Sequence, residues 1–325
     1  MRVVLDTTFL RRGPSGTGVY IERLAEALGS AGVDVVEAWN RRRRPPGSGG
    51  VGSVANLLGD ERWTSLELPA AARAAGADLI HHPLPAFSRL AGCPQVITVH
   101  DLAFVRLPEL FDRGYAVWAG RAHRAAARRA DGVICVSEAT RRDVGELWGV
   151  PALVAHHGPG QAPATPPPRG PARHFLYVGD DEPRKDLATL RAAHSLLGPA
   201  AAPLRIVGRA GEGVSAAELA ELHSAAIALV HPARSEGFGL TVLEAMAMGT
   251  PVIAARCPAV EEVGGAAIRW FAPGDADGLA VQMRSLAADR ALRDAVGAAG
   301  RERAGAFSWA ASARRHIAAY TLACR

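Results

Sequence analysis

The stretch "AIALVHPARSEGFGLTVLEAMAMGTPVIAA", residues 226–255, decides the fold because it joins two apolar runs through a glycine-bearing loop and a short helical segment. The first run ends near His231, and helical spacing extends from about Thr241 to Met248. Gly249 is a typical helix stop, and Pro251 leads into the second run. A strand, a helix and a strand in this order are typical of parallel sheets covered by helices.

The loop between the first strand and the helix has the features of a phosphate site. Residues 237–240 lie at the expected helix N-terminus, where unpaired amides and the helix dipole attract phosphate. Glu236 on the loop and Glu244 on the first turn are expected to face one cleft, where carboxylates can accept hydrogen bonds from the hydroxyls of a nucleotide sugar. The alternative is an ordinary loop carboxylate at Glu236 and a solvated helix residue at Glu244.

Similar apolar runs recur along the chain between alanine- and arginine-rich stretches with helical spacing. The expected strands are Arg2–Asp6, Val33–Trp39, Asp78–His82, Gln95–His100, Gly132–Ser137, Leu153–His157, His174–Gly179, Leu204–Gly208, Ala226–His231, Pro251–Ala255 and Ala267–Phe271. The expected helices include Val19–Leu28, Ala116–Arg129, Ala139–Trp148 and Leu187–Leu197. Strands that are apolar on both faces and alternate with helices predict an α/β protein with parallel sheets.

The stretch "GPGQAPATPPPRGPAR", residues 158–173, interrupts this pattern and is typical of an interdomain linker. We therefore expect a Rossmann-like domain over 1–160, a linker over 161–173 and a second domain over 174–306. Residues 307–325, with Ser308 as N-cap, are expected to form a helix that packs back on the first domain. Ligands of such sheets bind beyond the carboxyl ends of the strands, so the candidate sites are the loops there.

The composition is that of a soluble globular protein, with 49% hydrophobic and 21% charged residues among 325. The net charge of +5 suits an anionic partner. Arg41–Arg44 is expected to be a solvated loop, with contact to a membrane or an acceptor as the alternative. Four scattered cysteines indicate neither a zinc site nor a disulfide framework. The chain has no signal-peptide pattern and no long apolar window, so we expect a cytoplasmic protein that can also contact the inner membrane face peripherally.

Lys185, in "GDDEPRKDL" at residues 179–187, is the only lysine of the chain. A compact ammonium and a planar guanidinium are not interchangeable, and phosphate binding is one setting in which they differ. The alternative is that codon bias toward arginine left one lysine by chance.

Several of these segments together resemble one family. Glu236 and Glu244 around "GFGLTVL", followed by "AMAMGTPVI", resemble the E-x7-E signature of the retaining glycosyltransferases of family 4. "FLYVGDDEPRKDLATL" resembles the opening of the family's donor domain, and "SGTGVYIERLAEAL", "VITVHDLAF", "GVICVSEATRRDV" and "AHHGP" resemble further segments in the family's order. The resemblance covers nearly the whole chain. It implies the GT-B fold, in which two Rossmann-like doubly wound domains face each other across a cleft.

The resemblance also implies an activity and roles for individual residues. The activity is transfer of a hexose, mannose or glucose, from a nucleotide sugar to an acceptor hydroxyl with retention. The implied catalytic residues are Glu236 and His100, which would contact the transferred sugar, and Lys185, which would stabilise the departing nucleotide. The implied donor-binding residues are Glu244, Arg184, Gly237, Phe238, Gly239, Leu240, Thr241, Gly16 and Gly18. Taken alone, His100 would more often be structural, and the glycine pair would be only a turn.

No metal or cofactor is expected besides the co-substrate, GDP-mannose or a UDP-hexose. "GDADG", residues 274–278, contains the Asp-x-Asp pattern that holds a cation in GT-A enzymes, but it precedes a helical pattern, so Asp275 or Asp277 is expected to be an N-cap. Asp180 stands where relatives often have arginine. Between Leu204 and Ala226 there is room for only one strand and one helix, where the family usually has a further strand. Loops in that region help to recognise the nucleobase of the donor in the family, so the preferred nucleobase stays open.

Two further points stay open at the level of the sequence. "HHP", at His81–Pro83, either lines the acceptor side of the cleft or ends a strand. The short second domain also fits a GT-B subunit that binds a nucleotide sugar without turnover. The acceptor could be a glycan, a lipid-linked sugar or a small molecule. No nucleic-acid-binding module is recognisable, so no specific nucleic-acid partner is expected.

Overall fold

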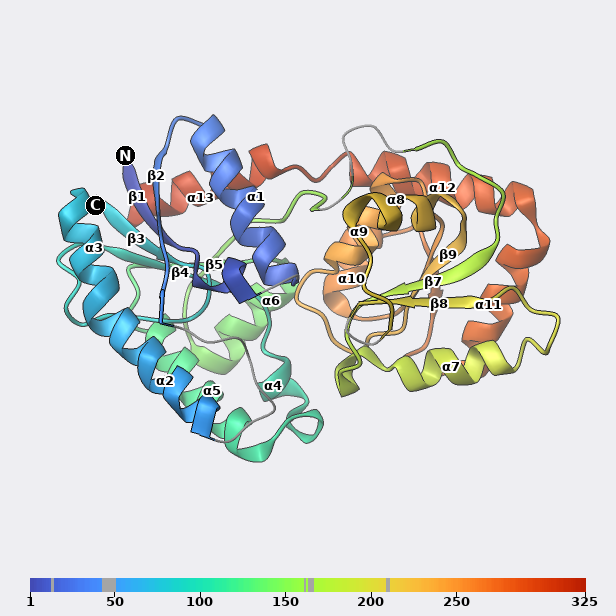
Figure 1. Cartoon of the computed structure of the whole chain (residues 1–325), viewed down its shortest axis with the longest axis horizontal. Coiled ribbons are helices and arrows are strands. Elements are labelled where there is room, and N and C mark those ends of the chain that lie inside the picture. The colour runs from blue at the N-terminus through green and yellow to red at the C-terminus, as the bar shows by residue number, and fades with distance from the viewer. Residues whose placement is uncertain (13–14, 43–50, 161, 163–166, 209–210) are drawn as a thin grey trace. The chain divides into compact units, whose positions relative to one another are not determined.

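The computed structural model describes residues 1–12, 15–42, 51–160, 162, 167–208 and 211–325. Within it the chain forms two compact units, Met1–Gly158 together with Trp309–Arg325, and Pro159–Ser308. Each unit contains one parallel sheet with helices packed against it (Figure 1). The prediction of an α/β protein with parallel sheets is therefore confirmed.

The sheet of the first unit has the order β2-β1-β3-β4-β5-β6, and all neighbouring strands are parallel. Its strands are β1 (Arg2–Asp6), β2 (Asp34–Ala38), β3 (Leu79–His82), β4 (Gln95–Val99), β5 (Gly132–Cys135) and β6 (Leu153–Val154). Its helices are α1 (Gly16–Ser30), α2 (Val51–Arg62), α3 (Leu68–Ala75), α4 (Ala103–Arg106), α5 (Arg113–Ala127), α6 (Glu138–Asp143) and α13 (Trp309–Ala323). Apolar side chains of β1, α1 and α13 share one core, which includes Leu5, Leu24 and Ala313.

Helix α13 is also held by a buried chain of polar side chains. His316 Nδ1 lies 2.8 Å from the Ser312 carbonyl oxygen, which can only accept, so Nδ1 carries the proton. Burial lowers the pKa of His316 to about 4, so the ring is neutral and its Nε2 accepts from the Tyr20 hydroxyl at 3.0 Å. Because that proton is used, the Thr98 hydroxyl donates to the Tyr20 oxygen at 2.8 Å.

The same reasoning determines the direction of the remaining hydrogen bonds in this series. Since the Thr98 hydroxyl proton is used, its oxygen accepts from His81 Nε2 at 2.9 Å. Burial, the largest effect, holds the pKa of His81 well below its ordinary value, so its Nδ1 accepts from the Tyr320 hydroxyl at 2.8 Å. Every proton therefore points one way along a chain that joins α13, α1, β3 and β4, and both histidines are held in single neutral tautomers.

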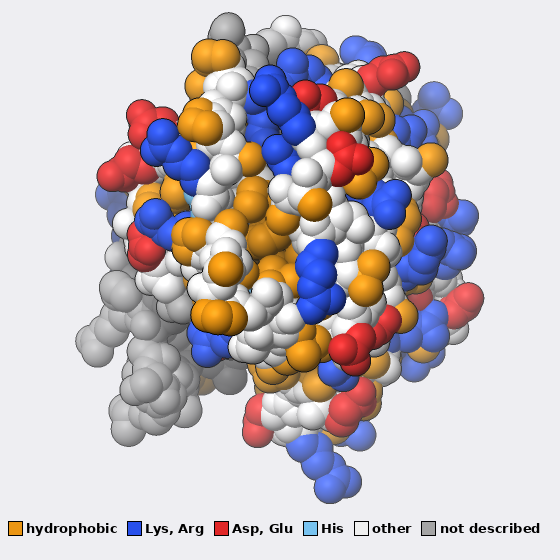
Figure 2. Space-filling view, turned by 90° about the vertical axis from the view of Figure 1, so that its right-hand side faces the viewer, with side chains coloured by type: hydrophobic (Ala, Val, Ile, Leu, Met, Phe, Trp, Pro, Cys, Tyr) orange, Lys and Arg blue, Asp and Glu red, His pale blue; other side chains and the backbone are white. Residues whose placement is uncertain are grey.

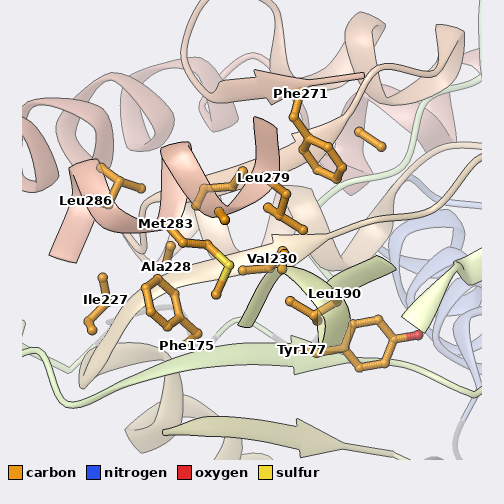
Figure 3. Packing of buried hydrophobic residues seen from close by; sticks show 14 of the residues in the cluster. Phe175, Tyr177, Leu190, Ile227, Ala228, Val230, Phe271, Leu279, Met283 and Leu286 are labelled. Atoms are coloured by element: carbon orange, nitrogen blue, oxygen red, sulfur yellow. The ribbon is translucent and has the colours of Figure 1, made fainter. Parts of the chain in front are cut away.

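The second unit has a sheet of order β11-β10-β9-β7-β8, also fully parallel. Its strands are β7 (His174–Val178), β8 (Leu204–Val207), β9 (Ala226–His231), β10 (Val252–Ala255) and β11 (Arg269–Phe271). Its helices are α7 (Leu187–Ser195), α8 (Ala216–Ser224), α9 (Leu240–Ala247), α10 (Pro258–Gly264), α11 (Ala276–Ala288) and α12 (Arg290–Ala304). One face of the sheet buries Phe175, Tyr177 and Val230 against Leu279 and Met283 of α11 (Figure 3).

Most local expectations from the sequence agree with the structure. Every expected strand is present, although the edge strands β6 and β11 are shorter than expected. Between β8 and β9 the described residues form one helix, α8, as expected. Asp275 is the N-cap of α11, and its side chain accepts from the Gly278 amide at 2.8 Å. Arg43 and Arg44 of the arginine run, and residues 161 and 163–166 of the expected linker, lie outside the described residues.

Charges are mixed on the molecular face that Figure 2 draws. Basic and acidic side chains are interspersed there, and no large area carries one sign of charge. Among the described residues, no helix is long and apolar enough to cross a membrane.

Candidate active site

The candidate site lies in the second unit, where two loops follow neighbouring parallel strands. β7 and β9 are adjacent in the sheet, so their carboxyl ends lie at the same edge and the loops after Val178 and His231 meet. The Arg234 amide donates to the Arg184 carbonyl oxygen at 2.8 Å, and the Arg234 guanidinium donates to Asp186 at 2.8 Å. The two loops therefore form one connected surface.

Glu236 stands at the centre of this surface and is surrounded by cations. Its Oε1 forms an ion pair with the Lys185 ammonium, and its Oε2 lies 3.5 Å from Arg184 Nη1. Arg184 also donates to Glu182 at 2.8 Å and to the Ser235 carbonyl oxygen at 3.3 Å. The Glu236 side chain is only 10% exposed. The structure thus brings together Glu236, Lys185 and Arg184, three residues predicted from the sequence.

The charge state of Glu236 follows from these contacts. Burial by itself would raise the pKa of the carboxyl, but Lys185, His231 and Arg184 together outweigh it and hold that pKa well below its ordinary value. Glu236 is therefore ionised at neutral pH. In this state it can accept hydrogen bonds from hydroxyls, and it has no proton to give as a general acid.

His231 links this carboxylate to the start of α9 and was missed by the sequence-based reasoning. Its Nε2 lies 3.2 Å from Glu236 Oε1, and its Nδ1 lies 3.4 Å from the Thr241 hydroxyl. The side chain is buried. Its place as the last residue of β9 was the available signal, because strand ends are where ligand sites form in parallel sheets.

The first turn of α9 has the geometry expected of an anion site. Its N-cap, Gly239, has φ = 93° and provides no side-chain cap. A Cβ at this position would lie 3.2 Å from Val260 Cγ2, so the turn suits only glycine. Phe238 is buried, with its ring edge-on to Phe307 at 5.9 Å, and this contact holds the loop in place. Leu240 and Thr241 then begin the helix.

Glu244 lies neither on the first turn of the helix nor in solvent, the two positions that the sequence suggested. Because α9 begins at Leu240, one residue earlier than expected, Glu244 lies on its second turn and not on its first. It is 5% exposed, so the alternative of a solvated helix residue is wrong. A carboxylate at this depth requires polar partners, which fits a binding or structural role better than a surface one.

The glycine pair of the first unit also differs from expectation. Gly16 and Gly18 lie in the first turn of α1 and not in a loop before it, because Ser15 caps the helix. The Ser15 hydroxyl accepts from the Gly18 amide at 3.0 Å, so in this structure that amide serves the cap. A Cβ on Gly16 would meet nothing within 4 Å.

The histidines of the first unit have protein partners. His100 follows β4, and its Nε2 donates to the Pro83 carbonyl oxygen at 2.9 Å. Burial is the main cause that lowers the pKa of His100, so the ring is neutral. His81 and His82 are buried at the end of β3, which excludes the reading in which their side chains line an open acceptor surface. His82 Nε2 lies 3.0 Å from Gln95 Oε1.

Among the described residues, no group of three or more histidine, cysteine, aspartate or glutamate side chains is placed to hold a metal ion. The carbonyl oxygen of Asp180, the residue that departs from the expected arginine, accepts from the Tyr177 hydroxyl at 2.7 Å.

Two protein-family models match most of the chain. The model of Glycosyltransferase Family 4 matches residues 14–159, and the model of Glycosyl transferases group 1 matches residues 209–303. The chain is 27% identical to the O-antigen chain mannosyltransferase B of Escherichia coli over 70% of each chain. It is 28% identical to a D-inositol 3-phosphate glycosyltransferase of Kineococcus radiotolerans, over 94% of this chain and 90% of that one.

Solved structures resemble the chain over almost its entire length. Sucrose-phosphate synthase from Thermosynechococcus elongatus has a TM-score of 0.79 at 21% identity and covers 99% of this chain and 98% of its own. The Anabaena protein HepE, solved in complex with UDP-glucose, has a TM-score of 0.68 at 17% identity, with 98% of each chain covered.

Proposed function

This chain belongs to glycosyltransferase family 4, whose members are retaining enzymes with the GT-B fold that use nucleotide sugars, and from that premise we propose that it transfers a hexose to an acceptor hydroxyl. The observation that carries the proposal is the cluster of Lys185, Arg184 and Glu236 beside the start of α9. It combines cations for a diphosphate with an ionised acceptor for sugar hydroxyls. The acceptor belongs to a glycan, a glycolipid or a small metabolite.

Mannose and glucose are the candidate sugars. The Glu-Pro-Arg-Lys run at residues 182–185 resembles mannosyltransferases, and one relative is a mannosyltransferase of O-antigen chains. HepE was solved with UDP-glucose, which keeps a UDP-hexose as the other candidate. We propose GDP-mannose as the first donor to test and UDP-glucose as the second.

We propose that Lys185 and Arg184 stabilise the diphosphate as it departs. Before a donor binds, Glu236 and Glu182 pair with these two cations. When the bond between the anomeric carbon and the phosphate oxygen breaks, negative charge grows on that oxygen, and prearranged cations lower the barrier. Glu236 is then free to accept from the hydroxyls of the hexose, while His231 restricts its orientation.

Retention follows the route that the family implies. The acceptor oxygen attacks the anomeric carbon on the face from which the diphosphate leaves, and the hydroxyl proton passes to the departing phosphate. No protein nucleophile takes part in this route. We further propose that Glu244 binds the ribose hydroxyls and that the amides near Gly237 and Thr241 bind the diphosphate.

The catalytic role of His100 at the transferred sugar and the donor-binding roles of Gly16 and Gly18 remain predictions carried over from the family. His100→Ala tests the first, through a loss of turnover with little change in donor affinity. Gly16→Ala tests the second, because added bulk there would meet nothing in the protein alone and would affect only a bound ligand.

The decisive experiment incubates the protein with a panel of nucleotide sugars and measures nucleotide release with and without acceptor extracts. Release from one donor, lost in Lys185→Ala and kept in Arg191→Ala on exposed α7 surface, would support the proposal. Donor binding without release from any donor would favour the alternative of a non-catalytic GT-B subunit.

A further inference from the structure

Helix α5 of the first unit has an exposed face of unusual composition. Its buried side consists of small residues, Ala116, Ala119, Ala126 and Ala127. On the opposite side, Val117 and Trp118 are each 48% exposed. Together with Arg113 and Arg121 these two side chains line a shallow hollow on the helix surface. Contact of these neighbouring valine and tryptophan side chains with water is unfavourable relative to burial against another surface.

The same face is strongly basic. Residues 113–130 include no aspartate or glutamate, and their arginines are Arg113, Arg121, Arg124, Arg128 and Arg129. All five are exposed. In the part of the chain that the structure describes, none of the five forms an ion pair.

Elsewhere on the surface of this unit, arginines do form ion pairs. Arg106 contacts Asp143 at 2.5 Å, Arg141 contacts Glu138 at 2.6 Å, and Arg23 contacts Glu26 at 3.0 Å. Among the described residues, the lack of ion pairs at the five arginines of this segment is therefore a local property and not a consequence of the arginine-rich composition alone.

Trp118 is also held in place. Its ring lies 6.3 Å from that of Tyr115 and 6.3 Å from that of His123. Tyr115 in turn stacks on Phe111 at 6.4 Å, and Phe104 joins these rings to the core. The exposed indole is thus supported from below, so little conformational entropy is lost when a partner covers it.

We propose that α5 is the docking face by which this protein binds an anionic lipid bilayer. Arginines around an exposed tryptophan and valine match the layered chemistry of a membrane surface, where charged headgroups lie above an apolar interior. The arginines would contact lipid phosphates while Trp118 and Val117 enter the interface. A polyanion without an apolar layer, such as nucleic acid, would account for the arginines but not for the exposed Val117. This inference does not depend on the proposed function, because binding needs no donor.

The test is sedimentation of the full chain with vesicles of phosphatidylcholine alone or mixed with phosphatidylglycerol. The wild-type protein should bind only the mixed vesicles. The double variant Arg121→Gln/Arg124→Gln should bind them roughly 25-fold more weakly, since each interfacial arginine contributes about fivefold. Its matched control, Arg191→Gln/Arg314→Gln, removes the same charge from exposed positions on α7 and α13 and should retain most of the binding.

A second arm tests the apolar contact. Trp118→Ala should weaken binding by roughly tenfold or more, and Val117→Ala by less. Val281→Ala, at a valine on α11 that is 54% exposed, is the matched control and should change nothing. Circular dichroism would confirm that each variant is folded.

Three results would overturn the proposal. The first is no binding of the wild-type chain to the mixed vesicles. The second is equal loss in the arginine pair on α5 and in its control, which would mean general attraction by net charge. The third is unchanged binding in Trp118→Ala, or duplex DNA competing the vesicles away at matched phosphate concentration, which would assign the face to polyanions in general.

Discussion

The two units place different chemistry at the carboxyl ends of their strands. In the second unit, Lys185 and Glu236 are charged and paired. In the first unit, His81, His100 and His157 are neutral, because burial lowers the pKa of each. Both units are parallel α/β sheets, so the difference comes from the side chains at equivalent positions and not from the architecture. Among the described residues at these strand ends, the paired cluster of Lys185, Arg184 and Glu236 belongs to the second unit.

Acid should affect the first unit most. The pKa of His316 is about 4 in the folded chain against an ordinary 6.5, so the unfolded chain binds more protons between these values. The stability is complete above about pH 6.5 and is lost as the pH falls toward 4, on the order of 3 kcal/mol for this group. Urea unfolding at a series of pH values measures this loss.

Two variants separate the contributions to that loss. His316→Asn should flatten the dependence of the unfolding free energy on pH, and His223→Asn, at a second-unit histidine whose pKa is also about 4, should flatten it by a similar amount. A slope that His316→Asn leaves unaltered would contradict the tautomer chain described above. Glu236 acts in a different pH range. Because its pKa is depressed, its contribution to the free energy of unfolding is present above about pH 4.5 and is lost only below that pH.

Lys185→Ala tests the charged side of the comparison. We expect kcat to fall by about a hundredfold, as for removal of one donor that stabilises a leaving group, with a smaller change in donor affinity. Lys185→Arg should recover only part of the rate, because a planar guanidinium fits the position of an ammonium poorly. Steady-state kinetics measure both variants, and an unchanged kcat in folded Lys185→Ala would show that the pair with Glu236 is only structural.

Glu244→Gln keeps the volume of the buried side chain and removes its charge. Donor affinity should weaken by roughly 1 to 3 kcal/mol, as expected for lost hydrogen bonds to a charged group. Isothermal titration with the intact nucleotide sugar measures this change. If the affinity for the nucleotide sugar stays the same while stability drops, Glu244 serves the fold of α9 and not the ribose.

Tyr20→Phe should have the smallest effect. It removes the hydroxyl between Thr98 and His316 and leaves both without that partner, which costs about 1 kcal/mol of stability. Thermal unfolding measures the cost, and donor binding by the charged cluster should be unaltered. A large loss of donor affinity would break the separation of roles between the two units.

Local structure and the members of the charged cluster, Lys185, Arg184 and Glu236, were indicated by the sequence, because the signals for them are short-range. Periodicity located the strands and helices, the N-cap pattern offered Asp275 or Asp277, of which the structure has Asp275, and the E-x7-E resemblance singled out Glu236 and Glu244. Short-range signals failed where a cap moved a boundary. Ser15 extends α1 over Gly16 and Gly18, and the earlier start of α9 moves Glu244 onto the second turn.

The sequence by itself therefore determined the α/β class, the family and the identity of the lone lysine with its two glutamates. Only the tertiary structure decided that Lys185 pairs with Glu236, 51 residues away, because the adjacency of β7 and β9 depends on the strand order of the sheet. It also decided that His231 lies beside Glu236 and that His316 contacts Tyr20, 296 residues away. Such contacts join groups that no local pattern relates, since sheet order and helix docking place them.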